Sequence, residues 1–171
     1  MALLAMMTGV ALILSVVESM LPININIPGV KIGLPNVITL FLVLNADKKS
    51  AFIVLLLRVV LSSIFAGQVM TFCYSLVGGL LCLFAMSFIN FILKGNPVWF
   101  ISLIGAIFHN IGQIAVAVCF MSWSVIAYLP ILIITGCIAG VLTGIVTDLT
   151  CRKMKKSGVL AKIQRTLGKH I

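Results

Sequence analysis

Arg58 lies near the middle of an apolar run, residues 50–61, in a chain that is 62% hydrophobic. A cation at the depth of a bilayer's hydrocarbon costs roughly 2.5–3.5 kcal/mol on insertion scales, so its side chain should face protein, water or a ligand rather than lipid. A guanidinium group can hold phosphate through two parallel hydrogen bonds. We therefore predict that Arg58 contacts an anionic group of a bound solute.

His109, Asn110 and Gln113 are polar residues within a second apolar run, residues 98–121, where polar side chains are also costly to expose to lipid. Gln113 lies one helical turn from His109 and Asn110, so the three side chains can share one face of a helix. Imidazole and carboxamide groups offer both hydrogen-bond donors and acceptors, which suits a heteroaromatic ring. The three residues are therefore candidates to bind the same solute. A solute with both a ring and a phosphate would fit, with these residues at its ring or ribose, and so would other polar solutes.

Further polar residues fall in the outer half of the membrane in the predicted topology: Glu18, Lys31, Asn36, Tyr74 and Ser75. The stretch Gly29-x-Lys31-x-Gly33 precedes a predicted helix, and its backbone N–H groups and positive helix end favour an anion. One polar ligand in an outward-open cavity explains several costly groups at one depth more economically than separate causes. Lys31 is thus predicted at the phosphates, and Asn36 and Tyr74 at the ring or ribose. Glu18 would orient Arg58 or accept a hydrogen bond from the ligand.

Each of these residues also has an interpretation that needs no ligand. Arg58 and Glu18 can form a buried structural ion pair, and His109 or Asn110 can simply hydrogen-bond a neighbouring helix. Lys31 can extend its side chain to the lipid headgroups, and Tyr74 can anchor the chain at the membrane interface. The sequence leaves these alternatives open for single residues.

The acidic residues argue against an enzyme. There are three, Glu18, Asp47 and Asp148, and they are scattered, so no Asp-rich motif can hold Mg²⁺ on a diphosphate. No catalytic residue, metal site or ATP-binding motif is predicted. If transport is active, its energy must come from another subunit or an ion gradient.

The elements that position these residues are predicted to be membrane helices. A mean hydropathy of +1.29 with 9% charged residues excludes an ordinary soluble domain, and a helix needs ~20 apolar residues to cross the hydrocarbon. We expect an all-α, polytopic bundle of six transmembrane helices within residues 1–150. Their ranges are about 2–21, 34–46, 50–67, 71–93, 98–121 and 125–149.

Residues 151–171 are predicted to form a separate basic, amphipathic cytoplasmic tail. Seven of the twelve basic residues lie there, and Val159, Leu160, Ile163 and Leu167 recur at helical spacing. This pattern is typical of a helix that lies on an anionic membrane surface, although a solvated tail is the alternative. Nucleic acid is not an expected partner, because no soluble basic face with base-reading groups is visible.

The distribution of Lys and Arg predicts the orientation of the chain. With a cytoplasmic N-terminus, the inner loops and tail hold ten cations and the outer loops hold only Lys31. This asymmetry predicts a multi-pass protein of a bacterial cytoplasmic membrane with both termini inside. Gly136, Gly140 and Gly144 form a ridge of small residues that favours close helix packing. The ridge serves either this bundle or a partner, such as a second copy or an energy-coupling subunit.

Several stretches resemble those of one known family. They are Pro28-Gly29-Val30-Lys31-Ile32-Gly33-Leu34-Pro35-Asn36, Leu57-Arg58-Val59, Tyr74-Ser75-Leu76-Val77-Gly78-Gly79 and Gly105-Ala106-Ile107-Phe108-His109-Asn110-Ile111-Gly112-Gln113. They resemble the small membrane family labelled heptaprenyl diphosphate synthase component I or Gx transporter. The resemblance runs through nearly all six predicted spans, and Pro35 stands where the family usually has Ala.

The family is similar to the substrate-binding S components of energy-coupling-factor vitamin transporters, and its members are often associated with flavin-dependent extracytoplasmic electron transfer. The resemblance therefore implies an S-component-like bundle that transports a flavin, with FAD ahead of FMN or riboflavin, for extracytoplasmic flavoproteins. In this interpretation the flavin is the transported ligand and not a cofactor. Two alternatives are an S component of a vitamin importer and an accessory membrane subunit of polyprenyl diphosphate synthesis.

Overall fold

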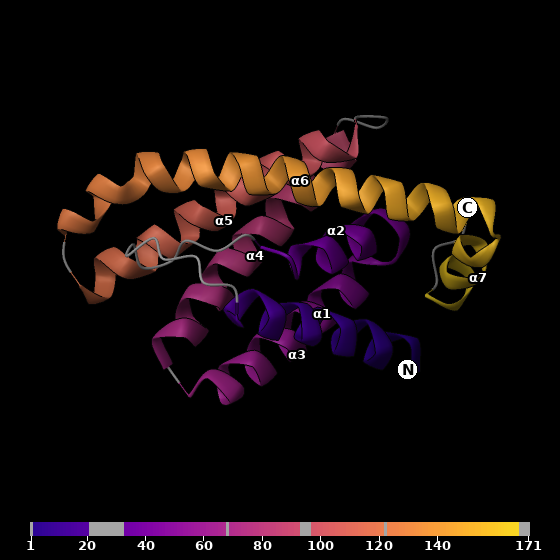
Figure 1. The fold of residues 1–171 in the computed structure, drawn as a ribbon, viewed down its shortest axis with the longest axis horizontal. Coiled ribbons are helices and arrows are strands. Elements are labelled where there is room, and N and C mark those ends of the chain that lie inside the picture. The colour runs from indigo at the N-terminus through magenta and orange to yellow at the C-terminus, as the bar shows by residue number, and fades with distance from the viewer. Residues whose placement is uncertain (1, 21–32, 68, 93–96, 122, 168–171) are drawn as a thin grey trace.

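The computed structural model describes residues 2–20, 33–67, 69–92, 97–121 and 123–167, and every structural statement below concerns these ranges. Their regular elements are all helices (Figure 1), which confirms the all-α prediction. In chain order they are α1 (Ala2–Met20), α2 (Asn36–Asn45), α3 (Lys48–Ala66), α4 (Val69–Ile92), α5 (Val98–Phe120), the short 3-10 helix η1 (Trp123–Tyr128), α6 (Leu129–Lys156) and α7 (Val159–Thr166).

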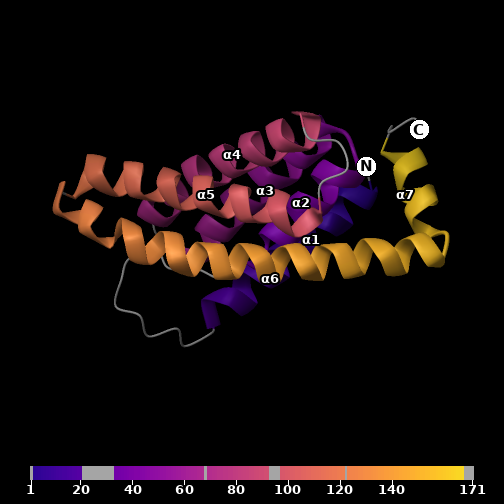
Figure 2. The ribbon, with the colours of Figure 1, turned by 90° about the horizontal axis from the view of Figure 1, so that it is seen from above.

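The long helices form a bundle around the short helix α2. α6 packs along α5, α5 along α4, α4 along α3, and α3 along α1 (Figures 1 and 2). α2 contacts α1, α3, α4, α6 and α7. Its side chains Leu40 and Leu42 are completely buried, and Phe41 and Val43 are nearly so. The centre of the core is therefore the one helix that is enclosed by the others.

Four of the helical segments are long and apolar enough to cross a membrane: α1, α4, α5 and the continuous segment Trp123–Lys156. α2 has ten residues, so it rises about 15 Å, half of a hydrocarbon core of about 30 Å. α3 has 19 residues but carries Lys48, Lys49 and Arg58, and it is not among the four. Five helices follow the predicted ranges, whereas α6 continues to Lys156, past the predicted end at 149 and into the predicted tail. The count of six membrane crossings stays a prediction.

Proline and glycine mark several helix boundaries, as their backbone chemistry requires. Pro35 and Pro97 stand directly before α2 and α5, where the missing N–H group of proline leaves no intrahelical bond unmade. Gly67 ends α3 with φ +64 and donates its N–H to the carbonyl of Ser63. Glycine adopts this left-handed conformation without steric strain, so the chain can turn sharply into α4.

α7 packs on the end of the bundle rather than pointing away from it. Leu160, Ile163 and Leu167 are buried in the core cluster, and Gln164 Nε2 donates a hydrogen bond of 3.5 Å to Asn45 Oδ1 of α2. This differs from the expectation of a helix whose apolar face lies on lipid, because that face is already occupied by α2 and α6. Figure 1 shows α7 beside the end of the bundle at which α1 begins.

The glycine ridge of α6 lies against α5. A Cβ on Gly144 would be 2.5 Å from Trp99 Cα, and one on Gly140 would be 2.8 Å from Ala106 Cβ. Ser102 and Thr143 share a hydrogen bond of 2.9 Å across the same interface. The small residues therefore allow the two backbones to approach closely within this chain.

Candidate functional site

The pair Gly78-Gly79 on α4 brings α3 and α5 to the same helical turn. A Cβ on Gly78 would be 2.9 Å from the carbonyl oxygen of His109 and 3.1 Å from Gln113 Cγ, both on α5. A Cβ on Gly79 would be 3.2 Å from Leu55 Cδ1 on α3. Consecutive helical residues point about 100° apart, so the two glycines face different neighbours. Leu55 of α3 and Gln113 of α5 therefore lie on two sides of the same turn of α4.

Arg58 lies one turn beyond Leu55 on α3. It is only 7% exposed, and the ionisable side chains near it are Cys82 of α4 and Glu18 of α1. Within the described ranges, its guanidinium makes no hydrogen bond and no ion pair. Since α3 and α4 run antiparallel, Arg58 lies within about one helical turn of the level of Gln113. A buried cation thus lies close to the glycine pair without a direct partner among these residues.

Gln113 is 2% exposed. Neither its Oε1 nor its Nε2 has a hydrogen-bond partner among the residues that the structure describes. Leaving a buried polar group unsatisfied costs about 1–3 kcal/mol, so this carboxamide is an unusual feature of the packed interface between α4 and α5. It is able to offer one acceptor and two donors to a bound molecule.

The polar residues of α5 point in two directions. His109 lies one turn before Gln113 on the same side, and its Cε1 is 3.1 Å from the position of a Gly78 Cβ. Asn110 points to α6 instead, where its Nδ2 donates a hydrogen bond to the carbonyl of Leu132 and packs against Gly136. The structure therefore joins His109 and Gln113 at α4 and places Asn110 in the interface between α5 and α6.

Glu18 and Asn36 meet at the start of α2. The backbone N–H of Gly33 donates a hydrogen bond to Glu18 Oε1, and Asn36, which is 8% exposed, has its Nδ2 3.0 Å from the position of a Gly33 Cβ. Glu18 acts on Arg58 electrostatically, but no ion pair joins these two described side chains. Glu18 thus contacts the backbone before α2 and influences Arg58 from a distance.

The remaining predicted site residues are less closely associated with this cluster. Tyr74 Oη lies 3.9 Å from the Sδ of Met121, at the end of α5. Ser75 is half-buried on α4, one turn before Gly79 and on the same side of that helix. Lys31 lies outside the described residues.

Cys82 is a neighbour of Arg58 that the sequence analysis treated only as a small apolar residue. It is completely buried, it lies near Arg58, and its Sγ is 3.2 Å from the position of a Gly105 Cβ on α5. The available signal was its spacing of four residues after Gly78, which places both on one face of α4.

Comparisons with known proteins give one match. The family model described as heptaprenyl diphosphate synthase component I matches residues 7–150, a range that contains every candidate site residue named above. No curated protein and no solved structure matches the chain.

Proposed function

This chain belongs to the heptaprenyl diphosphate synthase component I family, and we propose that it is a membrane transporter of a flavin nucleotide, with FAD as the first choice. In this proposal the solute binds near the Gly78-Gly79 turn of α4, between the side chains of α3 and α5. Six helices cross the cytoplasmic membrane, both termini are cytoplasmic, and the solute serves flavoproteins on the outer side. The protein makes and breaks no covalent bond.

One observation supports the proposal: among the described residues Gln113 is buried with neither polar atom hydrogen-bonded. Arg58, also buried, lies near the same level of α4 and forms no ion pair with a described residue. Burying either group without a partner costs free energy, because the charge or amide loses its hydrogen bonds to water and gains none in the protein. A single solute that satisfies both would offset both penalties. A structural role would instead require partners for each within the protein.

The chemistry of the two groups suggests the parts of the solute that they bind. A guanidinium offers a planar fork of donors that matches phosphate, so Arg58, together with Lys31, is assigned to the diphosphate. A carboxamide offers a donor and an acceptor side by side, so Gln113 is assigned to the polar edge of a flavin ring. His109, Asn36, Tyr74 and Ser75 complete the site in this assignment, and Asn110 supports it from the interface between α5 and α6.

The test is a titration of the purified full-length chain in detergent with FAD, FMN and riboflavin, followed by flavin fluorescence. Saturable FAD binding is expected, and Gln113→Leu should weaken it roughly tenfold or more, equivalent to about 1.4 kcal/mol. Arg58→Met should weaken FAD more than riboflavin, because riboflavin carries no phosphate. Gln164→Leu is the matched control, since this glutamine lies on α7 and bonds to Asn45.

Two results would refute the proposal: no saturable flavin binding by the wild-type chain, or unchanged FAD affinity in Gln113→Leu. Equal effects of Arg58→Met on FAD and riboflavin would refute the assignment of Arg58 to the phosphates.

The description of the matched family favours a second candidate, an accessory membrane subunit of a prenyl diphosphate synthase. That function needs a soluble catalytic partner and no flavin site. Three results together would favour the accessory subunit over the transporter. The chain would copurify with a prenyl synthase, the flavin titration would show no binding, and Gln113→Leu would leave synthase activity unchanged.

A further inference from the structure

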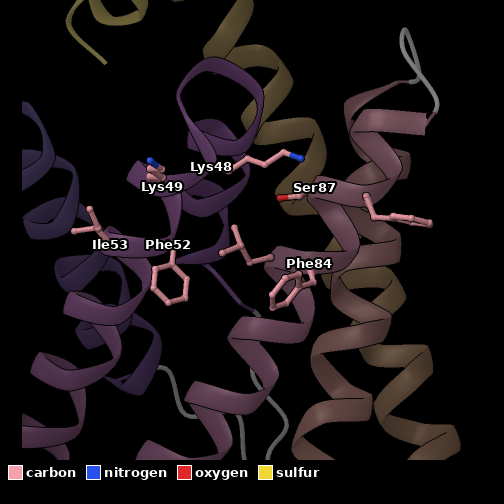
Figure 3. A pocket seen from close by; sticks show the side chains of 8 residues that line it. Lys48, Lys49, Phe52, Ile53, Phe84 and Ser87 are labelled. Atoms are coloured by element: carbon pink, nitrogen blue, oxygen red, sulfur yellow. The ribbon is translucent and has the colours of Figure 1, made fainter. Parts of the chain in front are cut away.

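A separate groove lies between α3 and α4, where α3 begins and α4 ends. Its cavity volume is about 570 Å³, within the range of roughly 300–1,000 Å³ that is typical of small-ligand sites. The residues that line it are Lys48, Lys49, Phe52, Ile53, Leu83, Phe84, Ser87 and Phe88. Figure 3 shows the two lysines at one end of the groove and the Phe52 and Phe84 rings at the other.

The walls and the rim of this groove differ in chemistry. Five of its eight lining residues are Phe, Ile or Leu, and Phe84 and Phe88 are 69% and 63% exposed. The other three are two lysines and a serine, so none of the described residues that line the groove is acidic. Lys48 Nζ lies 5.5 Å from the centre of the Phe91 ring, a cation–π distance that keeps its charge beside the apolar wall. The groove therefore offers an apolar floor below a cationic rim.

The rim coincides with a boundary of the membrane-type helices. α4 is a candidate membrane span that ends at Ile92, and Lys48 and Lys49 form the first turn of α3 beside that end. Lysines at such a boundary face the phosphates of the headgroup layer, whereas the phenylalanines one to two turns deeper face hydrocarbon. The order of cation and apolar surface along the groove thus follows the order of headgroup and chain in a phospholipid.

We propose that this groove binds an anionic phospholipid, with its phosphate on Lys48 and Lys49 and the first part of an acyl chain between Phe52 and Phe84. Anionic lipids gain about 1 kcal/mol for each Lys or Arg near the membrane surface, so two adjacent lysines select them over zwitterionic lipids. Ser87 adds a hydroxyl that can donate to the phosphate or glycerol oxygens. The site requires only that the chain lies in a membrane, and it does not depend on flavin transport.

The groove is distinct from the polar cluster around Gly78-Gly79. Phe52 precedes Arg58 by six residues and Phe84 follows Gly79 by five, which puts the groove about 8–9 Å further along the two helices. None of its lining residues belongs to the candidate solute site. Loss of lipid binding and loss of flavin binding can therefore be separated by mutation.

Native mass spectrometry of the detergent-solubilised full-length chain tests the proposal. Dioleoylphosphatidylglycerol and dioleoylphosphatidylcholine are added separately and the bound fractions compared. The wild-type chain should retain one phosphatidylglycerol with a preference of about fivefold or more, equivalent to about 1 kcal/mol. The double variant Lys48→Gln/Lys49→Gln should lower this preference to near unity.

The matched control is Lys155→Gln/Lys156→Gln, which removes the same charge from exposed positions at the end of α6 and should keep the preference. Ser87→Trp should reduce binding of both lipids, because the indole fills the groove. Equal retention of the two lipids by the wild-type chain, or equal losses in the two lysine double variants, would overturn the proposal. Displacement of bound phosphatidylglycerol by farnesyl diphosphate at equal concentration would also overturn it, in favour of a prenyl diphosphate occupant.

Discussion

Gln113 and Asn110 are two buried carboxamides on one helix that differ in their hydrogen bonding. Asn110 Nδ2 donates to the carbonyl of Leu132, whereas neither polar atom of Gln113 has a partner within the described part of the chain. Three residues on a helix correspond to a rotation of about 300°, enough to turn one side chain to α6 and the other to α4. At the scale of the residue, the unsatisfied group is the one that marks a binding site, and the satisfied group is part of the packing.

Arg58 provides a prediction that separates a binding role from a structural ion pair. In Arg58→Met the thermal unfolding midpoint of the ligand-free protein should be unchanged or higher, because a buried cation without a direct partner is replaced by an apolar side chain of similar length. If Arg58 were half of a buried ion pair with Glu18, its removal would destabilise the protein by about 3–5 kcal/mol. The measurement is thermal unfolding in detergent followed by circular dichroism.

The control for this experiment is Arg152→Met. Arg152 Nη2 lies 2.8 Å from Asp148 Oδ2 in an ion pair whose arginine side chain is 73% exposed. Exposed pairs of this kind contribute about 0.2–1 kcal/mol, so a small decrease in stability is expected. A larger decrease for Arg58→Met than for Arg152→Met would contradict the assignment of Arg58 to a ligand.

At the scale of the element, the close approach of α5 and α6 depends on glycine. Gly144→Ala should lower the free energy of unfolding by about 1–3 kcal/mol, because its Cβ would be 2.5 Å from the backbone at Trp99 Cα. Gly9→Ala on α1 is the matched control, since a Cβ there meets no atom within 4 Å, and it should stabilise the helix by up to about 1 kcal/mol. Equal effects of the two substitutions on thermal unfolding would show that the interface does not limit stability.

The attachment of α7 to the bundle gives a second prediction at this scale. Ile163→Ala should destabilise the protein by about 2–5 kcal/mol, the usual cost of truncating a buried isoleucine, because Ile163 is 6% exposed within the core cluster. Val159→Ala on the same helix should change stability by less than about 0.5 kcal/mol, since Val159 is 44% exposed. Limited proteolysis after residue 157 and thermal unfolding report these changes, and equal resistance of the two variants would mean that α7 is not docked.

The sequence predicts where the helices of this protein begin and end better than it predicts which surfaces they pack against. Apolar runs bounded by Pro35, Gly67 and Pro97 locate α2, α3 and α5 to within a few residues, because these boundaries follow from backbone chemistry. The pattern of Leu160, Ile163 and Leu167 predicts an amphipathic helix, but it is the same for a helix on lipid and for a helix on protein. Likewise, helical spacing groups Gln113 with His109 and Asn110, whereas only tertiary packing separates Asn110 from the other two.

At the scale of the whole molecule, the lysines and Arg152 of the described ranges lie at one end of the bundle, whereas Arg58 is buried in the middle of α3. Lys48 and Lys49 begin α3, and Arg152, Lys153, Lys155 and Lys156 lie in the last turns of α6. Figures 1 and 2 show the start of α1 and all of α7 at this same end. The arrangement supports a cytoplasmic position for both termini under the positive-inside rule.

This orientation predicts the accessibility of the two ends of the segment from η1 to α6. In a cysteine-free version of the chain, Trp123→Cys should react with a membrane-impermeant maleimide added to intact cells, because Trp123 is 77% exposed and begins the segment Trp123–Lys156, whose other end carries the cations. Lys153→Cys should react only after the membrane is permeabilised. Labelling of both positions in intact cells, or the reverse pattern, would contradict the proposed topology.

The ten residues of α2 have a consequence for the electrical properties of a transporter built in this way. A phosphate-bearing solute seated near Asn36 would be separated from the cytoplasm by α2 and by α7, which bonds to the far end of α2 through Asn45. The α2 part of this partition is about 15 Å long, half the thickness of the surrounding hydrocarbon. The transmembrane voltage would then fall over half the usual distance, so each phosphate charge in transit would experience a field about twice as steep as in the adjacent bilayer.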